Sequence, residues 1–166
     1  MTTNNKVFIN SVVRKINQIS EEILQRFLSK KEFHKALQQK IVDLASSFNL
    51  RGSSEYRIQN VRADGRGGSI DVIWKANSRP FAVFEIDSFP RSKSIKKLLL
   101  VGTPFRFWVC YGSKNPTLVL YKHDSNNLIK VIKLQNIHFK RRDEKIKIKK
   151  SRAIRKSILK FSRTLE

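Results

Sequence analysis

Cysteine, histidine and long apolar runs are scarce in this chain, and each shortage excludes a class of protein. The single cysteine, Cys110, excludes an internal disulfide framework and a cysteine-based zinc site, and the three histidines are too far apart in the sequence to have metal-ligand spacing. The longest apolar stretches, 98–101 and 107–111, fall far short of the ~20 residues that a membrane span needs, and the N-terminus has no apolar signal segment. We therefore expect a soluble intracellular protein, cytoplasmic or nucleoid-associated, that does not enter a membrane.

Acidic residues are the other shortage. The 166 residues include 13 Asp and Glu against 35 Lys and Arg, which gives a formal charge of +22 and a pI near 10.6. Such an excess draws a protein onto phosphate backbones, whereas the 40% of hydrophobic residues and eleven phenylalanines argue against a disordered basic chain. DNA is the expected partner, with RNA as an alternative and an anionic membrane surface far behind.

Two amphipathic helices are predicted at the N-terminal end of a chain whose length fits one domain. Apolar residues recur at three- and four-residue steps over 12–28 and again over 33–48. Ser29 and Glu32 have the spacing of a capping box, so the second helix is expected to begin there. Residues 1–32 then form an N-terminal helical extension, whose broad apolar side either packs on the core or joins two chains in a homodimer or higher oligomer.

The middle of the chain reads as strands. Short β-branched and aromatic runs alternate with Gly, Pro, Asn and Ser, and one helix with an apolar side is expected near 91–101. The runs 81–86 and 107–111 are almost continuously apolar, as in central strands covered on both faces. This order predicts an α/β fold over residues 33–136, with a mixed central β-sheet flanked by helices. The expected strands are 55–62, 69–75, 80–86, 105–111, 117–122 and 128–134.

The C-terminal residues 137–166 form a basic tail. Positions 138–166 hold twelve Lys and Arg against three acids, and apolar residues recur among them at helical steps. This pattern predicts a basic amphipathic helix that binds nucleic acid. The expected phosphate-binding residues of the tail are Lys140, Arg141, Arg142, Lys145, Lys147, Lys149, Lys150, Arg152, Arg155 and Lys156.

Three acids stand out because they lie inside or at the end of apolar runs. Asp71 falls within one predicted strand, and Glu85 and Asp87 end the next. A charge inside a central strand costs several kcal/mol unless it is paired or bound to metal. If the two strands form a hairpin, the three carboxylates meet on one patch, which suits Mg²⁺ or Mn²⁺. The plainer alternatives are an ion pair of Asp71 with Arg57 or Arg62, and an Asp87 that only caps the following helix.

The stretch Gly68-Ser-Ile-Asp71-Val-Ile-Trp, followed by Phe84-Glu85-Ile-Asp87 and then a helix and an apolar strand, resembles the PD-(D/E)XK, or restriction-endonuclease-like, nuclease superfamily. The resemblance spans about residues 36–122 and implies that Asp71 and Glu85 bind Mg²⁺ or Mn²⁺. Asp87 stands where the family usually has the lysine of Glu-x-Lys, an amino acid that orients water and steadies phosphate charge. Lysines of the next helix are candidates to replace it: Lys93, Lys96 and Lys97. The family often has a glutamate on the helix before the first strand, and Gln39 or Gln38 stands there.

These features make a metal-dependent DNA endonuclease of restriction, mobile-element or recombination type the leading hypothesis. Basic residues beside the acids in sequence would bind flanking phosphates: Arg62, Arg66, Lys75 and Arg79. One alternative is a catalytically inactive nuclease-fold protein that binds DNA or RNA, since the usual lysine is missing. Another is a basic structural component of a nucleoprotein assembly.

Overall fold

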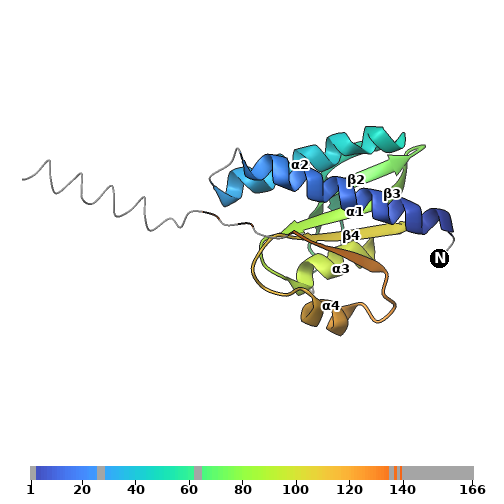
Figure 1. Cartoon of the computed structure of the whole chain (residues 1–166). Helices are drawn as coiled ribbons and strands as arrows, with labels where there is room; N and C mark the ends of the chain where they lie inside the picture. Colours follow the sequence, from blue (N-terminus) through green and yellow to red (C-terminus); the bar gives the residue numbers. More distant parts are fainter. Residues whose placement is uncertain (1–2, 26–28, 62–64, 135–136, 138, 140–166) are drawn as a thin grey trace, which may run out of the picture.

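A computed structural model describes residues 3–25, 29–61, 65–134, 137 and 139 (Figure 1). In this part of the chain, helices and strands combine into an α/β fold, as predicted. The helices are α1 (Thr3–Leu24), α2 (Lys30–Leu44), the short 3₁₀ helix η1 (Ala45–Phe48), α3 (Ser92–Leu100) and α4 (Thr117–His123), and the strands are β1 (Arg51–Ile58), β2 (Gly68–Ala76), β3 (Arg79–Asp87), β4 (Phe105–Cys110) and β5 (Ile129–Lys133).

The five strands form one mixed sheet in the order β1-β2-β3-β4-β5. The first three are antiparallel neighbours, and β4 and β5 continue parallel to β3. The hairpin predicted between β2 and β3 is present, and its tight turn places Asn77 and Ser78 at φ of 46° and 67°. Positive φ at both central residues is what the favoured two-residue hairpin turn requires. The parallel connections pass through α3 and α4, as parallel neighbours demand.

Helices cover both faces of the sheet, so its central strands are buried on both sides (Figure 1). α1 and α2 pack on one face, where Trp74, Phe84 and Phe107 are fully buried. α3 and α4 pack on the other, over Trp108 and Val83. This two-sided burial explains why β3 and β4 are apolar along almost their whole length.

The apolar side of α1 belongs to the core of its own chain. Ile9, Val12 and Ile16 are buried in the cluster that includes the sheet. The ring of Phe8 lies 4.5 Å from that of Phe105 and 5.4 Å from that of Phe81, measured between centroids. Of the two roles considered for residues 1–32, packing on the core therefore accounts for the apolar side.

The predicted start of the second helix is confirmed. Ser29 is the N-cap of α2, and its hydroxyl accepts the amide N–H of Glu32 at 3.2 Å. The helical path ends at Asn49, which takes the left-handed conformation with φ of 57°.

Three expected elements differ from the structure, the last of them helix α1, which begins at Thr3 rather than near residue 12. Residues 117–122 form helix α4 rather than a strand, and β1 begins at Arg51 rather than near residue 55. Gly52 explains the second difference: a Cβ there would lie 2.2 Å from the carbonyl oxygen of Val42, so glycine lets this end of β1 pass under α2. The first four residues of β1 look like a polar loop, yet they pair with β2.

The predicted basic tail and its helix, with all ten of its phosphate-binding residues, fall at positions 140–166, outside the described residues, and so does Arg62. Among the helices that the structure describes, none is long and apolar enough to span a membrane.

Candidate functional site

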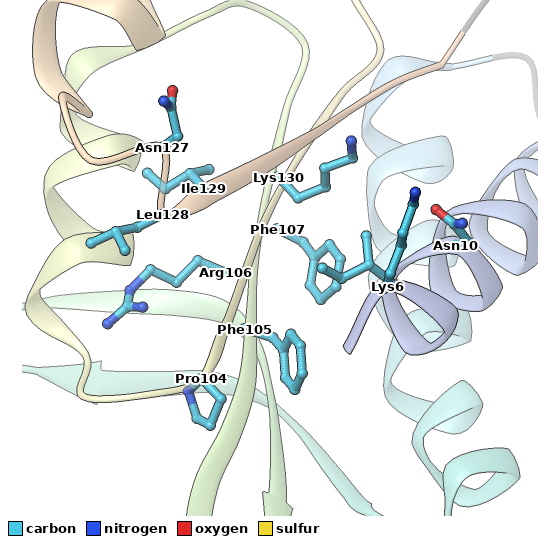
Figure 2. A pocket seen from close by; sticks show the side chains of 11 residues that line it. Lys6, Asn10, Pro104, Phe105, Arg106, Phe107, Asn127, Leu128, Ile129 and Lys130 are labelled. Carbon is cyan, nitrogen blue, oxygen red and sulfur yellow. The ribbon is translucent and has the colours of Figure 1, made fainter. Parts of the chain in front are cut away.

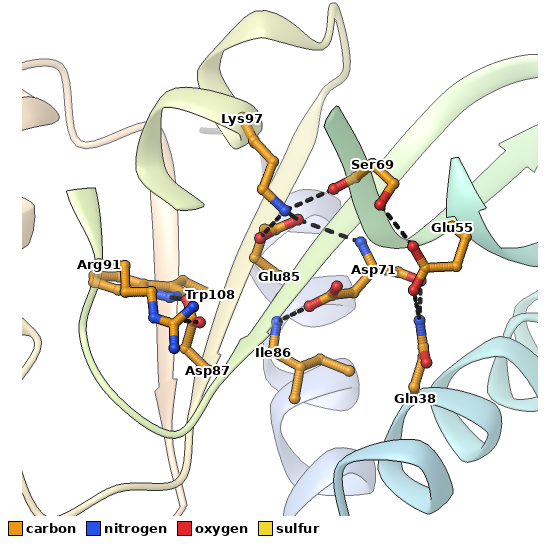
Figure 3. Close-up of polar contacts among 10 residues, drawn as sticks. All are labelled: Gln38, Glu55, Ser69, Asp71, Glu85, Ile86, Asp87, Arg91, Lys97 and Trp108. Carbon is orange, nitrogen blue, oxygen red and sulfur yellow. Dashed lines mark hydrogen bonds and ion pairs between the residues drawn. The ribbon is translucent and has the colours of Figure 1, made fainter. Parts of the chain in front are cut away.

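Asp71 and Glu85 meet where the backbone pairing of β2 and β3 ends. The last paired residues at this end of the hairpin are Val72 and Phe84, which places Asp71 and Glu85 next in line. There the carboxylates bridge the strands: Asp71 Oδ2 accepts the N–H of Ile86 at 2.7 Å, and Glu85 Oε1 accepts the N–H of Asp71 at 3.3 Å (Figure 3). The pairing predicted from the sequence between these two acids is present.

Lys97 joins these carboxylates from the other side. It lies on α3, in the crossover from β3 to β4, and points at Glu85 (Figure 3). Its Nζ lies 2.6 Å from Oε1 and 2.5 Å from Oε2 of Glu85, and it also donates to the carbonyl oxygen of Ser69 at 2.6 Å. The Lys97 and Glu85 side chains are only 12% and 3% exposed, so this ion pair is shielded from water. A cation from the following helix thus pairs with the Glu85 carboxylate.

Asp87 lies beside this pair with contacts of its own. Its Oδ2 accepts the indole N–H of Trp108 at 2.9 Å, and its Oδ1 lies 4.0 Å from Nε of Arg91. The N-cap of α3 is Arg91, with no side-chain capping bond, so Asp87 is not the cap of that helix. Within the described part of the chain, no three Asp, Glu, His or Cys side chains are close enough together to hold one metal ion. The structure therefore brings together two of the three predicted acids, not all three.

A fourth acid, Glu55, belongs to the site and is absent from the sequence prediction. Its carboxylate accepts the hydroxyl of Ser69 at 2.6 Å and the amide of Gln38 at 3.0 Å. The same amide group of Gln38 donates to the carbonyl oxygen of Asp71 at 2.9 Å. Of the two glutamines considered on α2, Gln38 therefore reaches the site, whereas Gln39 bonds to Asp43 on the exposed side.

The sequence pattern does not single out Glu55, because this residue lies in a polar stretch at the position where the first strand is predicted to begin. Its φ of 53° is unusual for a strand residue. Position 55 lies between Ser54 and Tyr56, which pair with Val72 and Ile70, so the register puts it opposite Asp71. The sequence marks Glu55 only as one of the few acidic residues in the chain.

Burial and mutual repulsion set the charge of the two central carboxylates. Burial raises the pKa of Glu85 to about 8, and the Asp71 carboxylate adds to this rise, while Lys97 opposes it. Burial also raises the pKa of Asp71, against the hydrogen bond from Ile86 and the charges of Lys97 and His34. The hydrogen bonds from Ser69 and Gln38 instead lower the pKa of Glu55. The pair thus favours a bound proton or cation, as expected of acids crowded in a site of low polarity.

The other predicted site residues lie apart from this cluster. Lys93 and Lys96 are exposed on α3, and the ammonium of Lys75 lies 5.0 Å from the centre of the Tyr56 ring. Arg66 and Arg79 are exposed, at the two ends of the β2–β3 hairpin. Of the three helix lysines, only Lys97 reaches the carboxylates.

The donor chemistry of the site fits a hard divalent cation. Asp71 and Glu85 offer adjacent carboxylate oxygens, and Mg²⁺ in proteins is commonly held by one or two carboxylates, with waters and substrate phosphate completing its shell. Lys97 now contacts both oxygens of Glu85, so an ion there would share Glu85 with Lys97 or displace its ammonium.

A pocket on the described part of the chain lies elsewhere. It has a volume of about 660 Å³ and lies between the first turns of α1 and the starting ends of β4 and β5 (Figure 2). Phe105 and Phe107 form part of its wall, and Lys6 and Lys130 stand at its rim. None of its lining residues belongs to the carboxylate cluster. The carboxylate cluster thus lies toward the opposite end of the strands from this pocket.

Comparisons with protein-family models, with curated proteins and with solved structures give no match for this chain.

Proposed function

We propose that the protein is a metal-dependent DNA endonuclease with a restriction-endonuclease-like core. One observation carries the proposal: Asp71 on β2, Glu85 on β3 and Lys97 on α3 converge in a shielded site. The order of elements supports it, because a helix, three antiparallel strands, a crossover helix and a parallel strand follow one another as in the PD-(D/E)XK superfamily. The charge of +22 supplies affinity for a phosphate backbone.

Each residue has a distinct part in the proposed reaction. Asp71 and Glu85 would hold Mg²⁺ or Mn²⁺, which lowers the pKa of a bound water and clamps the scissile phosphate. Lys97 is positioned to hydrogen-bond the attacking water and to offset the negative charge that develops on the phosphate. Its bond to the carbonyl oxygen of Ser69 fixes the ammonium in place, and Glu55 in turn holds the Ser69 side chain. Asp87 holds Trp108 and so supports the end of β3 rather than taking the role of a lysine.

One observation also favours the alternative, a catalytically inactive nuclease-fold protein that binds DNA or RNA. Lys97 satisfies both oxygens of Glu85, as a purely structural ion pair would. A basic component of a nucleoprotein assembly would share the charge but would not need two carboxylates facing each other across strands.

Plasmid cleavage tests the proposal. Purified protein is incubated with supercoiled plasmid and Mg²⁺ or Mn²⁺, beside Asp71→Asn, Glu85→Gln and Lys97→Met, with Lys96→Met as the matched control on the exposed side of the same helix. We expect nicking or linearisation by the wild type and the control, and a loss of at least about a hundredfold in each of the other three. Plasmid left equally intact by wild type and variants would contradict the proposal, as would equal cleavage by all of them, which would indicate a contaminant.

A further inference from the structure

An exposed phenylalanine lies beside the candidate site. Phe89 follows Asp87 by two residues, in the loop from β3 to α3, and 46% of its surface is exposed. An isolated apolar residue on a surface needs no explanation. Phe89 is not an isolated apolar residue, because the ammonium of Lys114 lies over its ring, 4.6 Å from the ring centre.

The loop that carries Phe89 is fixed in place. A Cβ at Gly112 would lie 1.8 Å from the carbonyl oxygen of Ser88, so the loop after β4 packs directly against the loop after β3. Lys133 donates to the carbonyl oxygens of Gly112 and Lys114, which holds that second loop from β5. Such a ring is preorganised, and its position does not depend on the ligand.

The loop that carries Phe89 lies at the carboxyl ends of the parallel strands. Asp87, Cys110 and Lys133 end three parallel strands and lie in one row across the sheet. Ligands of α/β sheets bind at the carboxyl ends of parallel strands. Phe89 follows Glu85 by four positions, so their Cα atoms are at most about 14 Å apart. Stacked nucleotides advance about 3.4 Å each along a strand, so this distance spans about four nucleotides.

The charges around Phe89 suit a phosphate backbone. Arg91 is 64% exposed at its side chain and lies on the same loop, and Lys93 and Lys114 are exposed beside it. Aromatic rings next to exposed cations are how proteins bind unpaired nucleic-acid strands, because a base stacks on the ring while its phosphates meet the cations. Bases within a duplex offer no free face for this contact.

We propose that Phe89 stacks on an unpaired base within about four nucleotides of the phosphate at Asp71 and Glu85. The substrate is then a nucleic acid with a single-stranded, branched or opened segment at that point, not a continuous duplex. This inference rests on the proposed nuclease function for its location, and Phe89 is a residue that determines specificity rather than a catalytic one.

Binding measurements without metal test the inference. Full-length protein in EDTA is titrated into a fluorescently labelled single strand, a duplex of the same sequence, and the same strand with abasic sites. We expect Phe89→Ala to weaken binding of the normal single strand about tenfold and to leave duplex and abasic-strand binding nearly unchanged, while Phe89→Trp keeps the wild-type affinity. Tyr121→Ala, which removes an aromatic residue that is 86% exposed on α4, is the matched control and should change none of the three affinities.

An equal loss for single strand and duplex would overturn the inference, because it would indicate a general effect on charge or fold. So would an equal loss on the abasic strand, or the same loss in Tyr121→Ala. Because EDTA prevents cleavage, these outcomes are separate from the plasmid test: cleavage that persists with no effect of Phe89 overturns only this inference, and a stacking effect without cleavage overturns only the nuclease proposal.

Discussion

At the scale of single residues, the site depends on where one ammonium lies. The segment 92–100 contains three lysines, at 93, 96 and 97, and its helical spacing does not by itself select one of them. Packing makes the selection: Ser94, Ile95 and Leu98 are buried, so Lys97 lies at the margin of the buried side, whereas Lys93 and Lys96 face solvent. Of these three lysines, Lys97 alone then contacts a buried carboxylate.

Removing the Lys97 ammonium should destabilise the fold. Lys97→Met keeps the length of the side chain but leaves the buried Glu85 carboxyl without its partner. Breaking a buried ion pair on one side costs about 3 kcal/mol, while a substitution at the exposed Lys96 stays within about 0.5 kcal/mol. Urea unfolding of wild type, Lys97→Met and Lys96→Met measures both, at a pH above the folded pKa of Glu85 of about 8, where its carboxylate is charged.

The double variant Glu85→Gln/Lys97→Met separates the causes of that loss. If the cost comes from an unpaired buried carboxyl, the double variant should be more stable than Lys97→Met alone. A double variant that is less stable than either single variant would contradict this account.

The raised pKa of Glu85 predicts how stability depends on pH without metal. Between the unfolded pKa near 4.5 and the folded pKa of about 8, the folded state keeps a proton that the unfolded state has lost. Stability is therefore highest below the lower value and falls as pH rises through this window, by up to about 1.4 kcal/mol per pH unit. Urea unfolding in EDTA at several pH values from about 5 to about 8 measures the slope.

Glu85→Gln is the control for this slope, because a glutamine does not titrate. The large net charge also changes stability with pH, but it contributes equally to wild type and variant. The difference between the two curves should therefore fall with pH. A difference that is constant from about pH 5 to about pH 8 would contradict the raised pKa.

The sequence predicted the two acids that lie in apolar strands, named Lys97 and Gln38 only among alternatives, and missed Glu55. Asp71 and Glu85 were conspicuous because a charge inside a buried strand has a high cost. Glu55 and Gln38 have ordinary neighbours, and only the register of β1 against β2 and the packing of α2 bring them to the site. Asp87 lies two residues after Glu85 on the same strand and is therefore predicted to share its face. In the structure, however, the Asp87 carboxylate accepts a hydrogen bond from the buried indole of Trp108 on β4. Such long-range contacts are not encoded in local periodicity.

At the scale of elements, substitutions in helix α1 can show whether its apolar side packs in the core of one chain or in an interface between chains. Phe8 contacts the rings of Phe48, Phe81 and Phe105, at centroid distances of 5.3, 5.4 and 4.5 Å. Phe8→Ala should therefore cost about 3 kcal/mol, against less than about 0.5 kcal/mol for Val7→Ala, whose residue is 63% exposed on the same helix. Urea unfolding of both variants is the measurement.

Protein concentration distinguishes the two roles of α1. If its apolar side stabilises the single chain, the unfolding midpoint should be independent of concentration. A midpoint that rises with concentration, and loses that dependence in Phe8→Ala, would indicate that α1 stabilises an oligomer instead.

Helix α4 shows why one predicted element was wrong. The run Leu118-Val-Leu-Tyr121 is rich in residues that favour strands, and its propensity predicted one. In the structure Leu118 and Tyr121 are 75% and 86% exposed, while Val119 and Leu120 pack under α3. A period of two would have buried alternate residues, whereas one partly buried pair with exposed neighbours fits a short helix that connects parallel strands. The sheet topology therefore overrides the local preference.

At the scale of the whole molecule, the positive charge is divided between two parts of the chain. Of the net charge of +22, residues 140–166 carry twelve Lys and Arg against three acids, which is +9, and residues 1–139 carry the remaining +13. The first part falls outside the described residues, and the second contains the carboxylate site. Affinity and chemistry are thus expected to be separable, because counterion release depends on the number of contacted phosphates and not on the site.

Ending the chain after Phe139 should lower DNA affinity without unfolding the protein. Ile137 and Phe139 both pack against the main core, so this truncation keeps them. If about half of the twelve basic residues contact phosphates, the slope of log affinity against log salt concentration should become shallower by about five, since each contact contributes about 0.9. Fluorescence anisotropy across a series of salt concentrations, for full-length and truncated protein, gives both slopes.

The thermal unfolding midpoint and plasmid cleavage at low salt serve as controls for the truncation. Both should stay near the full-length values, because α1 to β5 and the Asp71, Glu85 and Lys97 cluster are unchanged. An unchanged salt slope would assign the phosphate contacts to residues 1–139 instead. A shallower salt slope together with loss of cleavage at every salt concentration would show that the tail takes part in the site. That result would contradict the division of charge into a binding segment and a catalytic core.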